Sequence, residues 1–334
     1  MLRFERTVMA NPYLFIVGCP RSGTTLLQRM VNAHPEIAVT PETHWIPRFI
    51  KKRWGVTRKG LVTPKLIARL LEHPGFVALS IGREEVAKLI GTGEPITYSS
   101  FVSGIFDLYG KAQGKRLVGD KTPGYVRRMN TLHVLWPAAR FVHLIRDGRD
   151  VYLSMANRPM EQLKSGVFDS WAEHPVPTAA LWWELNVRPG REAGKALGPE
   201  LYYEIRYESL TANPREECAK LCLFLGVPYH DSMLRFHEGR IGTKAEPGGK
   251  PAWQPITSGP RDWRSQMPAA DIELFEAAAG ELLEELGYAR AVPHPRSACL
   301  ESASRIRDRL ARDPLTHYGL ERTQLEGKEM SIRR

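Results

Sequence analysis

Short apolar runs alternate along the chain with longer stretches in which apolar residues recur every three or four positions. The short runs are typical of strands, and the longer periodic stretches are typical of amphipathic helices. This alternation favours βα units, and therefore an α/β fold with a parallel sheet flanked by helices. The predicted strands cover residues 13–17, 37–39, 116–118, 140–145 and 201–205. The predicted helices cover residues 24–32, 125–135, 151–157, 214–225 and 270–286.

Two segments depart from this alternation. Residues 239–260 are rich in Gly, Pro, Lys and Thr and predict a long loop, which in compact domains is usually a binding element or disordered. The chain after Tyr288 has mixed charges and little apolar periodicity until about Arg305. The sequence therefore predicts a single domain over residues 1–290 and a partly helical C-terminal tail over residues 291–334.

The first candidate binding element is the segment FIVGCPRSGTT, residues 15–25. An apolar strand leads into a glycine-rich turn that opens the next helix, so backbone amides at a helix N-terminus form an anion cradle. Gly18 and Gly23 have the spacing of a nucleotide-triphosphate P-loop, but Thr24 stands where such a loop carries its lysine. We expect a phosphorylated ligand here, and not a magnesium triphosphate cleaved between its β and γ groups.

A second candidate site follows the strand FVHLIR. Where a triphosphatase ends a strand with an aspartate for magnesium, this strand ends in Arg146, which favours direct binding of an anion. Residues 147–150 make a turn before a helix that carries Ser154 on its first turn and Arg158 one turn later. Arg146, Ser154 and nearby amides could bind a second phosphate. Alternatively, Arg146 pairs with a surface carboxylate and Ser154 is an ordinary helix residue.

Composition narrows the class of protein. With 334 residues and 43% apolar side chains, the chain can bury one large α/β core or two modest ones. The net charge of +10 indicates either an anionic partner or a solvated charged surface. A charged small-molecule cofactor explains it at least as well as nucleic acid, because no basic run with interleaved aromatic residues is present.

Location and cysteine chemistry follow from the same composition. No apolar run approaches the ~18 to 20 residues that span a bilayer, and no signal peptide is evident, so the sequence predicts a cytoplasmic protein. The four cysteines are too few and too scattered for a disulfide framework. Cys218 and Cys222 are expected to pack inside a helix and not to bind a metal.

The two candidate sites together resemble those of the sulfotransferase superfamily, which uses 3′-phosphoadenosine-5′-phosphosulfate (PAPS) as sulfuryl donor. The order of motifs is similar to the protein-tyrosine sulfotransferase branch, and the match covers roughly residues 13–288. The motifs are RSGTTLL, HPE at 34–36, PETHWIPR at 41–48, DKTP around Lys121, RDGR, RYESL at 206–210, FLGVPY and a closing W…LGY. Several motifs in order are far more specific than a glycine-rich loop alone.

The resemblance implies roles for the donor-binding residues. The loop at residues 20–25 would hold the 5′-phosphosulfate, and Arg146 with Ser154 would hold the 3′-phosphate. The complete set of implied donor contacts is Arg21, Ser22, Gly23, Thr24, Thr25, Arg146, Ser154, Arg158 and Tyr207. Taken alone, Tyr207 would be interpreted as a half-buried residue at a sheet edge.

The resemblance also implies the catalytic residues. Glu42 would be the general base, and Lys121 with Arg21 would neutralise the bridging and sulfuryl oxygens. Without the motif context, Glu42 would be a solvated turn residue and Lys121 a surface lysine. His44 and Arg48 would contact the acceptor substrate, although the tyrosine branch carries an arginine at the position of His44.

Several positions leave alternatives open. His34 and His44 are rival candidates for the base, with His34 expected instead to bind backbone carbonyls. Asp262 stands where the branch has a donor-binding lysine, and the branch's donor-loop serine has no clear counterpart. The residues that could replace the lost charge are Lys250, Arg261 and Arg264.

The sequence therefore predicts a metal-independent, PAPS-dependent sulfotransferase of bacterial type. Its partner would be a hydroxyl-bearing acceptor, such as a tyrosine, a sugar or a small natural product, with no nucleic acid and no membrane. A homodimer is left open. The alternatives are a P-loop kinase, which would need a lysine at Thr24 and a magnesium carboxylate at Arg146, and a nucleotide-binding module without catalysis.

Overall fold

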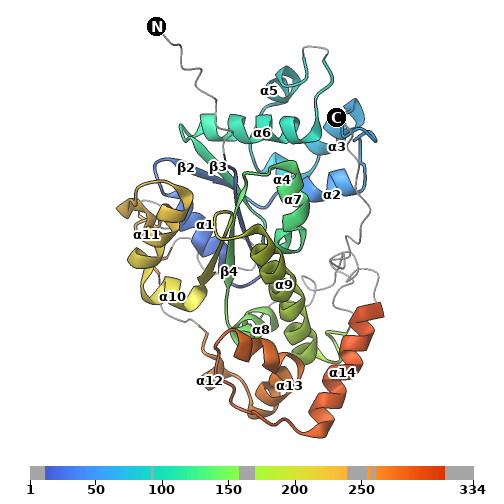
Figure 1. Cartoon of the computed structure of the whole chain (residues 1–334), viewed down its shortest axis with the longest axis vertical. Coiled ribbons are helices and arrows are strands. Elements are labelled where there is room, and N and C mark those ends of the chain that lie inside the picture. Colours follow the sequence, from blue (N-terminus) through green and yellow to red (C-terminus); the bar gives the residue numbers. More distant parts are fainter. Residues whose placement is uncertain (1–11, 92–93, 158–169, 239–253, 257–260, 313–334) are drawn as a thin grey trace. The chain divides into compact units, whose positions relative to one another are not determined.

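The structure is a computed structural model that describes residues 12–91, 94–157, 170–238, 254–256 and 261–312. The chain divides into two compact units (Figure 1). The first consists of residues 1–146 and 189–260, and the second of residues 147–188 and 261–334. The predicted domain boundary at residue 290 stays a prediction.

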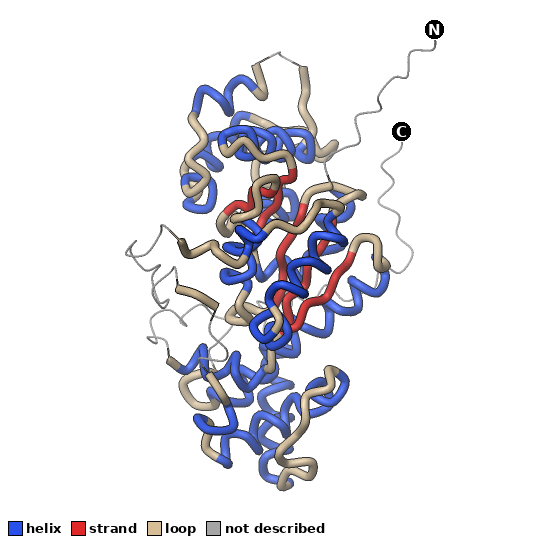
Figure 2. The backbone as a smooth tube through the Cα atoms, turned by 90° about the vertical axis from the view of Figure 1, so that its left-hand side faces the viewer, coloured by secondary structure: helices blue, strands red, loops and turns tan. Residues whose placement is uncertain are grey.

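The first unit contains a five-stranded sheet in the order β2-β3-β1-β4-β5, with every neighbouring pair parallel. Figure 2 shows these strands in red with helices beside them. The strands are β1 (Leu14–Gly18), β2 (Ile37–Thr40), β3 (Leu117–Lys121), β4 (Arg140–Ile145) and β5 (Tyr202–Arg206). The predicted parallel α/β fold is confirmed, with each strand within three residues of its expected bounds.

Both faces of this sheet are buried, because alternate residues of each strand point to opposite sides. Phe15 and Val17 of β1 belong to one apolar cluster, and Leu14 and Ile16 belong to the other. The second cluster is completed by α1 (Thr24–Asn32), α10 (Tyr207–Ala212), α11 (Pro214–Leu225) and the 3-10 helix η4 (Asp231–Met233). Cys218 and Cys222 lie in this cluster, as expected.

The first cluster is packed mainly by helices from residues 46–112 and 123–135. These helices are α2 (Ile46–Lys51), α3 (Pro64–Leu71), α4 (Pro74–Val77), α5 (Arg83–Lys88), α6 (Tyr98–Ala112), the 3-10 helix η1 (Pro123–Arg128) and α7 (Met129–Leu135). The expected single helix at 125–135 is therefore a 3-10 turn followed by a short α-helix.

The described residues of the second unit are mainly helical. It contains α8 (Gly148–Ala156), α12 (Trp263–Gln266), α13 (Ala269–Glu285) and α14 (Ser297–Arg312). The helix α9 (Pro175–Leu197) crosses the division of the chain at Pro189. Helix α8 begins three residues earlier than expected, because the Asp147 side chain caps it by accepting a hydrogen bond from the Arg149 amide at 2.9 Å.

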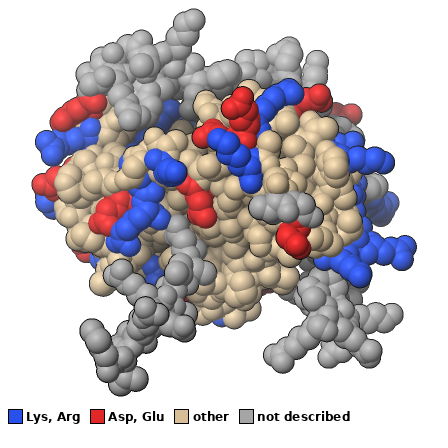
Figure 3. Space-filling model, turned by 90° about the horizontal axis from the view of Figure 1, so that it is seen from above, with Lys and Arg blue, Asp and Glu red and all other residues tan. Residues whose placement is uncertain are grey.

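The charged side chains are mixed on the face seen in Figure 3. Lys and Arg side chains lie among Asp and Glu side chains, with broad areas of other residues between them. The net charge of +10 is therefore not gathered there into one continuous basic surface.

Candidate active site

The loop between β1 and α1 has the backbone of a cradle. Gly23 has φ 97°, and Arg21, a non-glycine residue, also lies in the left-handed region at φ 79°. A Cβ atom on Gly23 would lie 2.4 Å from the Tyr207 ring, so only glycine fits beside that ring. The Ser22 hydroxyl is buried and has no hydrogen-bond partner in the described structure. A buried hydroxyl of this kind is suited to a polar ligand in the loop.

A single ammonium group connects this loop to the predicted base. Lys121 is the last residue of β3, and its side chain is only 4% exposed. Its Nζ lies 2.6 Å from Oε1 of Glu42 and 3.3 Å from Oγ1 of Thr25, in the first turn of α1. The structure thus brings together Lys121, Glu42 and the start of α1, which follows the loop after β1.

The turn that carries Glu42 is held by buried hydrogen bonds. The Thr43 amide donates to Oγ1 of Thr122 at 3.0 Å, and the Thr43 hydroxyl lies 2.8 Å from the Tyr125 hydroxyl. A Cβ atom on Gly75, in α4, would lie 2.3 Å from the carbonyl oxygen of Thr43. The turn is therefore packed against the end of β3, η1 and α4. These contacts fix the backbone from which the Glu42 side chain extends.

His44 contacts the same carboxylate. Its Nε2 lies 3.0 Å from Oε2 of Glu42, and its backbone is left-handed at φ 57°. Burial raises the pKa of Glu42, but the hydrogen bond from His44 and the positive charge of Lys121 outweigh burial and lower that pKa from 4.5 to about 2. Glu42 is therefore an ionised carboxylate at neutral pH, and each of its oxygens has a cationic or polar neighbour.

Asp120 lies beneath this cluster, and the sequence analysis did not identify it. The side chain is fully buried on β3, where Oδ2 accepts a hydrogen bond from Thr40 at 2.9 Å and Oδ1 has no hydrogen-bond partner in the described structure. Burial raises the pKa of Asp120 from 3.8 to about 6, against the opposing effect of hydrogen bonds from neighbouring threonines. The DKTP segment is polar and contains no local pattern that would predict burial of this carboxyl group.

The two remaining histidine and arginine predictions have different outcomes. His34 is buried, with Nδ1 accepting from the Glu36 amide at 3.1 Å and Nε2 2.8 Å from the Pro228 carbonyl oxygen. Both ring nitrogens are used, so His34 is not a candidate base. Arg48 lies on α2, and its guanidinium is 4.8 Å from the centre of the Trp54 ring. A contact between Arg48 and the acceptor substrate stays a prediction.

Arg146 follows the end of β4 and is buried. Its guanidinium lies 4.3 Å from the centre of the Tyr207 ring, the ring that also closes against Gly23. Tyr207 is itself buried at the start of α10, so it connects Arg146 with the loop instead of occupying a half-exposed sheet edge. Arg146 and the loop between β1 and α1 therefore both lie next to the same aromatic ring.

The other predicted donor contacts lie in the second unit or outside the described residues, and their roles stay predictions. Ser154 lies in α8 of the second unit, where it is buried. Arg158 and Lys250 lie outside the described residues. Asp262 caps α12 by accepting a hydrogen bond from the Arg264 amide at 3.1 Å, and Arg261 donates to the Leu153 carbonyl oxygen at 2.8 Å. Asp262 therefore has a structural role where the resemblance led us to expect a lysine.

Arg149, in the RDGR motif, has a structural role that sequence reasoning missed. Its guanidinium is fully buried and lies 2.7 Å from both Asp147 and Glu276, and 3.5 Å from the centre of the Trp263 ring. A Cβ atom on the neighbouring Gly148 would lie 2.6 Å from the Trp183 ring, which explains the glycine. No local pattern could identify Glu276, because it is 127 residues away.

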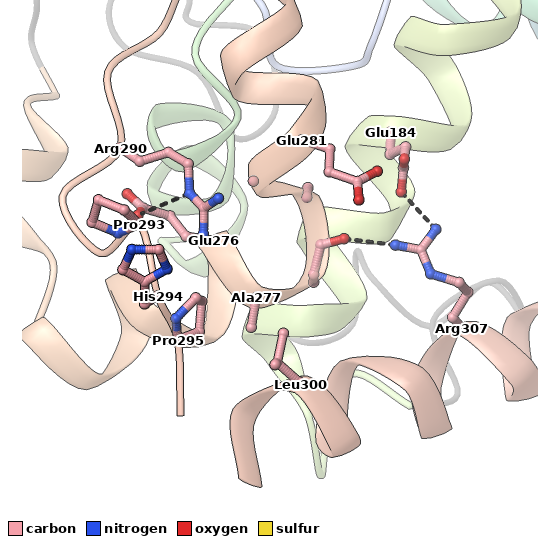
Figure 4. A pocket seen from close by; sticks show the side chains of 13 residues that line it. Glu184, Glu276, Ala277, Glu281, Arg290, Pro293, His294, Pro295, Leu300 and Arg307 are labelled. Carbon is pink, nitrogen blue, oxygen red and sulfur yellow. Dashed lines mark hydrogen bonds and ion pairs between the residues drawn. The ribbon is translucent and has the colours of Figure 1, made fainter. Parts of the chain in front are cut away.

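The second unit also contains a cavity of about 600 Å³ (Figure 4). Arg307 of α14 lies 2.9 Å from Glu184 of α9 and donates at 2.7 Å to the carbonyl oxygen of Ala278, where α13 leaves helical geometry at Ala279. Arg307 and Glu184, which line the cavity, are thus paired with each other, and Arg307 also stabilises the kink of α13 at Ala279. None of the predicted site residues lines the cavity.

The described residues lack two kinds of feature. They contain no group of three or more His, Cys, Asp or Glu side chains arranged to hold a metal ion. None of the helices that the structure describes is both long enough and apolar enough to span a bilayer.

Comparison with known proteins places this geometry in context. A profile of the sulfotransferase family matches residues 12–231. The chain is 28% identical to protein-tyrosine sulfotransferase A of Caenorhabditis elegans over 241 residues, 70% of this chain and 54% of that protein. It is 25% identical to nodulation protein NoeE of Sinorhizobium fredii over 348 residues, 97% of this chain and 77% of that protein.

The length and fold of these relatives also matter. The chain spans about half the length of the protein-tyrosine sulfotransferases of Caenorhabditis elegans and Drosophila melanogaster that it matches. Among solved structures, the sulfotransferase domain of the Synechococcus PCC 7002 olefin synthase has a TM-score of 0.55 and 24% identity, covering 84% of this chain and 95% of that one. This likeness supports the α/β fold described above.

Proposed function

This chain belongs to the sulfotransferase family, and we propose on that basis that it transfers a sulfuryl group from PAPS to a hydroxyl-bearing acceptor. One observation carries the proposal: Nζ of Lys121 lies within 3.3 Å of both the phosphate loop, at Thr25, and the carboxylate of Glu42. A group transferred from the loop to an acceptor activated by Glu42 would pass beside this ammonium. A cytoplasmic location and a homodimer stay predictions.

The residues present fit the proposed donor. The unpartnered hydroxyl of Ser22 and the amides at the start of α1 are suited to the 5′-phosphosulfate, together with Arg21, Gly23, Thr24 and Thr25. We propose Arg146 and Tyr207 for the 3′-phosphate side. The further contribution of Ser154 and Arg158 rests on their positions in the sequence.

In-line sulfuryl transfer requires that the donor and the acceptor are positioned and that the developing negative charge is neutralised. PAPS supplies the sulfuryl group; a new bond forms between the acceptor oxygen and sulfur while the bond from sulfur to the phosphate oxygen breaks in line. Glu42 takes the acceptor's proton as the new bond forms, because its carboxylate is ionised and anchored. Lys121 and Arg21 neutralise the charge that develops on the leaving oxygen and the sulfuryl group.

Calorimetric titration tests the donor. Adenosine 3′,5′-bisphosphate is expected to bind with micromolar or tighter affinity without magnesium, and ATP with magnesium is expected to bind poorly, because Thr24 replaces the P-loop lysine. The reverse preference would favour a kinase. Tight binding of the bisphosphate without turnover of PAPS against a panel of phenols, sugars and peptides would favour a non-catalytic module.

The variant Arg146→Ala locates the 3′-phosphate within the same titration. It should weaken binding of adenosine 3′,5′-bisphosphate by about 1.5 to 3 kcal/mol, the size of a charge-assisted hydrogen bond. The control ligand is 5′-AMP, whose affinity should hardly change because it lacks the 3′-phosphate. Equal losses for the two nucleotides would show that Arg146 does not contact this phosphate.

A further inference from the structure

The residue that ends β2, two positions before Glu42, is bound to a buried carboxyl group. Thr40 pairs with Asp120 in the register of β2 and β3, and its hydroxyl group donates to Oδ2 of Asp120 at 2.9 Å. Both side chains are fully buried. This contact fixes the point at which the chain leaves β2 and enters the turn that carries Glu42.

Thr43, the residue after Glu42, is held at the same place. Its amide donates to Oγ1 of Thr122 at 3.0 Å, and its hydroxyl group lies 2.8 Å from the Tyr125 hydroxyl. Burial raises the pKa of Asp120, whereas the hydroxyl groups of Thr43 and Thr122 act to lower it, so both hydroxyl groups also lie close to this carboxyl group. Threonines from both ends of the Glu42 turn therefore surround Asp120.

The fold alone does not require a carboxyl group at this position. Strand β3 is buried along its whole length, and its first residues, Leu117 and Val118, are apolar. Oδ1 of Asp120 has no hydrogen-bond partner in the described structure, and a buried polar atom without a partner costs stability. Buried polar groups that are incompletely bonded and have a shifted pKa are enriched at functional sites.

Asp120 is not placed to react itself. Its side chain is fully buried, and Asp120 and Lys121 are consecutive residues of one strand, so their side chains point to opposite faces of the sheet. Lys121 contacts Glu42 at 2.6 Å on the other face. An effect of Asp120 on the reaction must therefore pass through the turn between Thr40 and Thr43.

Building on the proposed function, we propose that Asp120 is a positioning residue that holds Glu42 in place for proton transfer by binding the threonines before and after it. Without this carboxyl group, residues 40–43 lose their shared anchor and the Glu42 carboxylate loses its alignment with the acceptor hydroxyl. A misplacement of about 1 Å can lower a rate about 10²-fold. Asp120 thus contacts neither donor nor acceptor and acts only through Glu42.

The variants Asp120→Val and Asp120→Asn test the hydrogen bonds. Valine suits a strand but cannot accept a hydrogen bond from Thr40, whereas the amide oxygen of asparagine still can. The measurement is the single-turnover rate constant for release of adenosine 3′,5′-bisphosphate (PAP) from PAPS, with p-cresol as acceptor. Asp120→Val should lower this rate constant about 10²-fold. Asp120→Asn should keep it within about tenfold of the wild-type value.

A double variant shows whether Asp120 acts through Glu42. In a Glu42→Gln background, Asp120→Val should cause little further loss, because the base that it positions is already absent. A residue that acts on the rate independently of Glu42 would lower it by the same factor in both backgrounds. Equal factors would overturn the proposal, and so would equal losses for Asp120→Val and Asp120→Asn in the wild-type background.

Hydrogen exchange gives a readout that does not depend on turnover. The amides of Thr43 and Ile46 donate to Thr122 and Tyr125, so they report the order of the turn. Exchange in the peptide that covers residues 40–46 should be faster in Asp120→Val than in the wild-type protein, and close to wild type in Asp120→Asn. Unchanged exchange in Asp120→Val would show that the turn does not depend on this carboxyl group.

The matched control is Asp107→Asn. Asp107, on α6, also accepts a hydrogen bond from a hydroxyl group, that of Tyr13 at 3.2 Å, but it is not bound to the Glu42 turn. This variant should keep the wild-type rate constant. If Asp120→Val does not fold, Thr40→Val removes the same hydrogen bond and should also slow transfer without weakening the binding of PAP.

The two proposals fail in different ways. A wild-type protein that neither binds PAP nor releases it from PAPS would overturn the proposed function, and the positioning role with it. Normal binding of PAP, together with equal rate constants for the wild-type protein and Asp120→Val, would overturn only the positioning role.

Discussion

Glu42→Gln is expected to lower kcat for sulfuryl transfer by about 10²- to 10⁴-fold while leaving the affinity for adenosine 3′,5′-bisphosphate nearly unchanged. The amide has almost the shape of the carboxylate and can still contact Lys121, but it cannot take a proton from the acceptor. Single-turnover measurement of PAP release reports the transfer step, and calorimetric titration reports nucleotide binding.

The matched control is Glu36→Gln. Glu36 also pairs with a basic residue, Arg116, but this ion pair lies at the start of β3 and not beside the phosphate loop. The control should keep wild-type kcat. If Glu42→Gln remains active, another group must take the acceptor's proton, and His44 would then be the candidate that acts on the acceptor directly.

Arg149→Met is expected to lower the free energy of unfolding by about 3 to 5 kcal/mol, because it leaves two buried carboxylates, Asp147 and Glu276, without their shared cation. Methionine is flexible enough to fill much of the space beside Trp263, so the loss reports mainly the missing charge and hydrogen bonds. The measurement is the urea midpoint and slope followed by tryptophan fluorescence and circular dichroism.

Arg188→Met provides the comparison in the same unit. Arg188 pairs with Glu184 and Glu285, but its side chain is 32% exposed and one of its partners is 46% exposed. Water screens such a pair, so the expected loss is about 1 kcal/mol or less. Losses of similar size for Arg149→Met and Arg188→Met would show that burial does not make the Arg149 network important for stability.

The elements that the sequence predicted most closely have strong local signals. Helix α11 has the predicted bounds because Pro214 opens it and Gly226, with φ 69°, ends it. Helix α9 was missed because it contains Pro189, a residue that normally argues against a helix interior. The helices between residues 46 and 88 were missed because they are short or carry few buried positions, and their packing in the apolar cluster determines them.

Part of the candidate site was predictable for a topological reason. Parallel strands present their carboxyl ends at one edge of a sheet, so side chains that follow β1, β2 and β3 meet there. The proximity of Lys121, Glu42 and Thr25 follows from the order β2-β3-β1. The contact between Arg149 and Glu276, and the burial of Asp120, depend on tertiary packing that no local pattern encodes.

Asp120 also couples folding to proton uptake. The pKa of Asp120 is raised to about 6 in the folded chain, against an ordinary value of 3.8. Between these two pH values the folded state therefore keeps a proton that the unfolded state has released. The contribution of Asp120 to stability therefore falls as the pH rises from about 4 to 6, by a total of about 3 kcal/mol, and does not change above that range. Lowering the pH from about 6 to 4 thus increases the contribution of Asp120 to stability, whereas Glu42, whose pKa is lowered to about 2, stays ionised over the same interval.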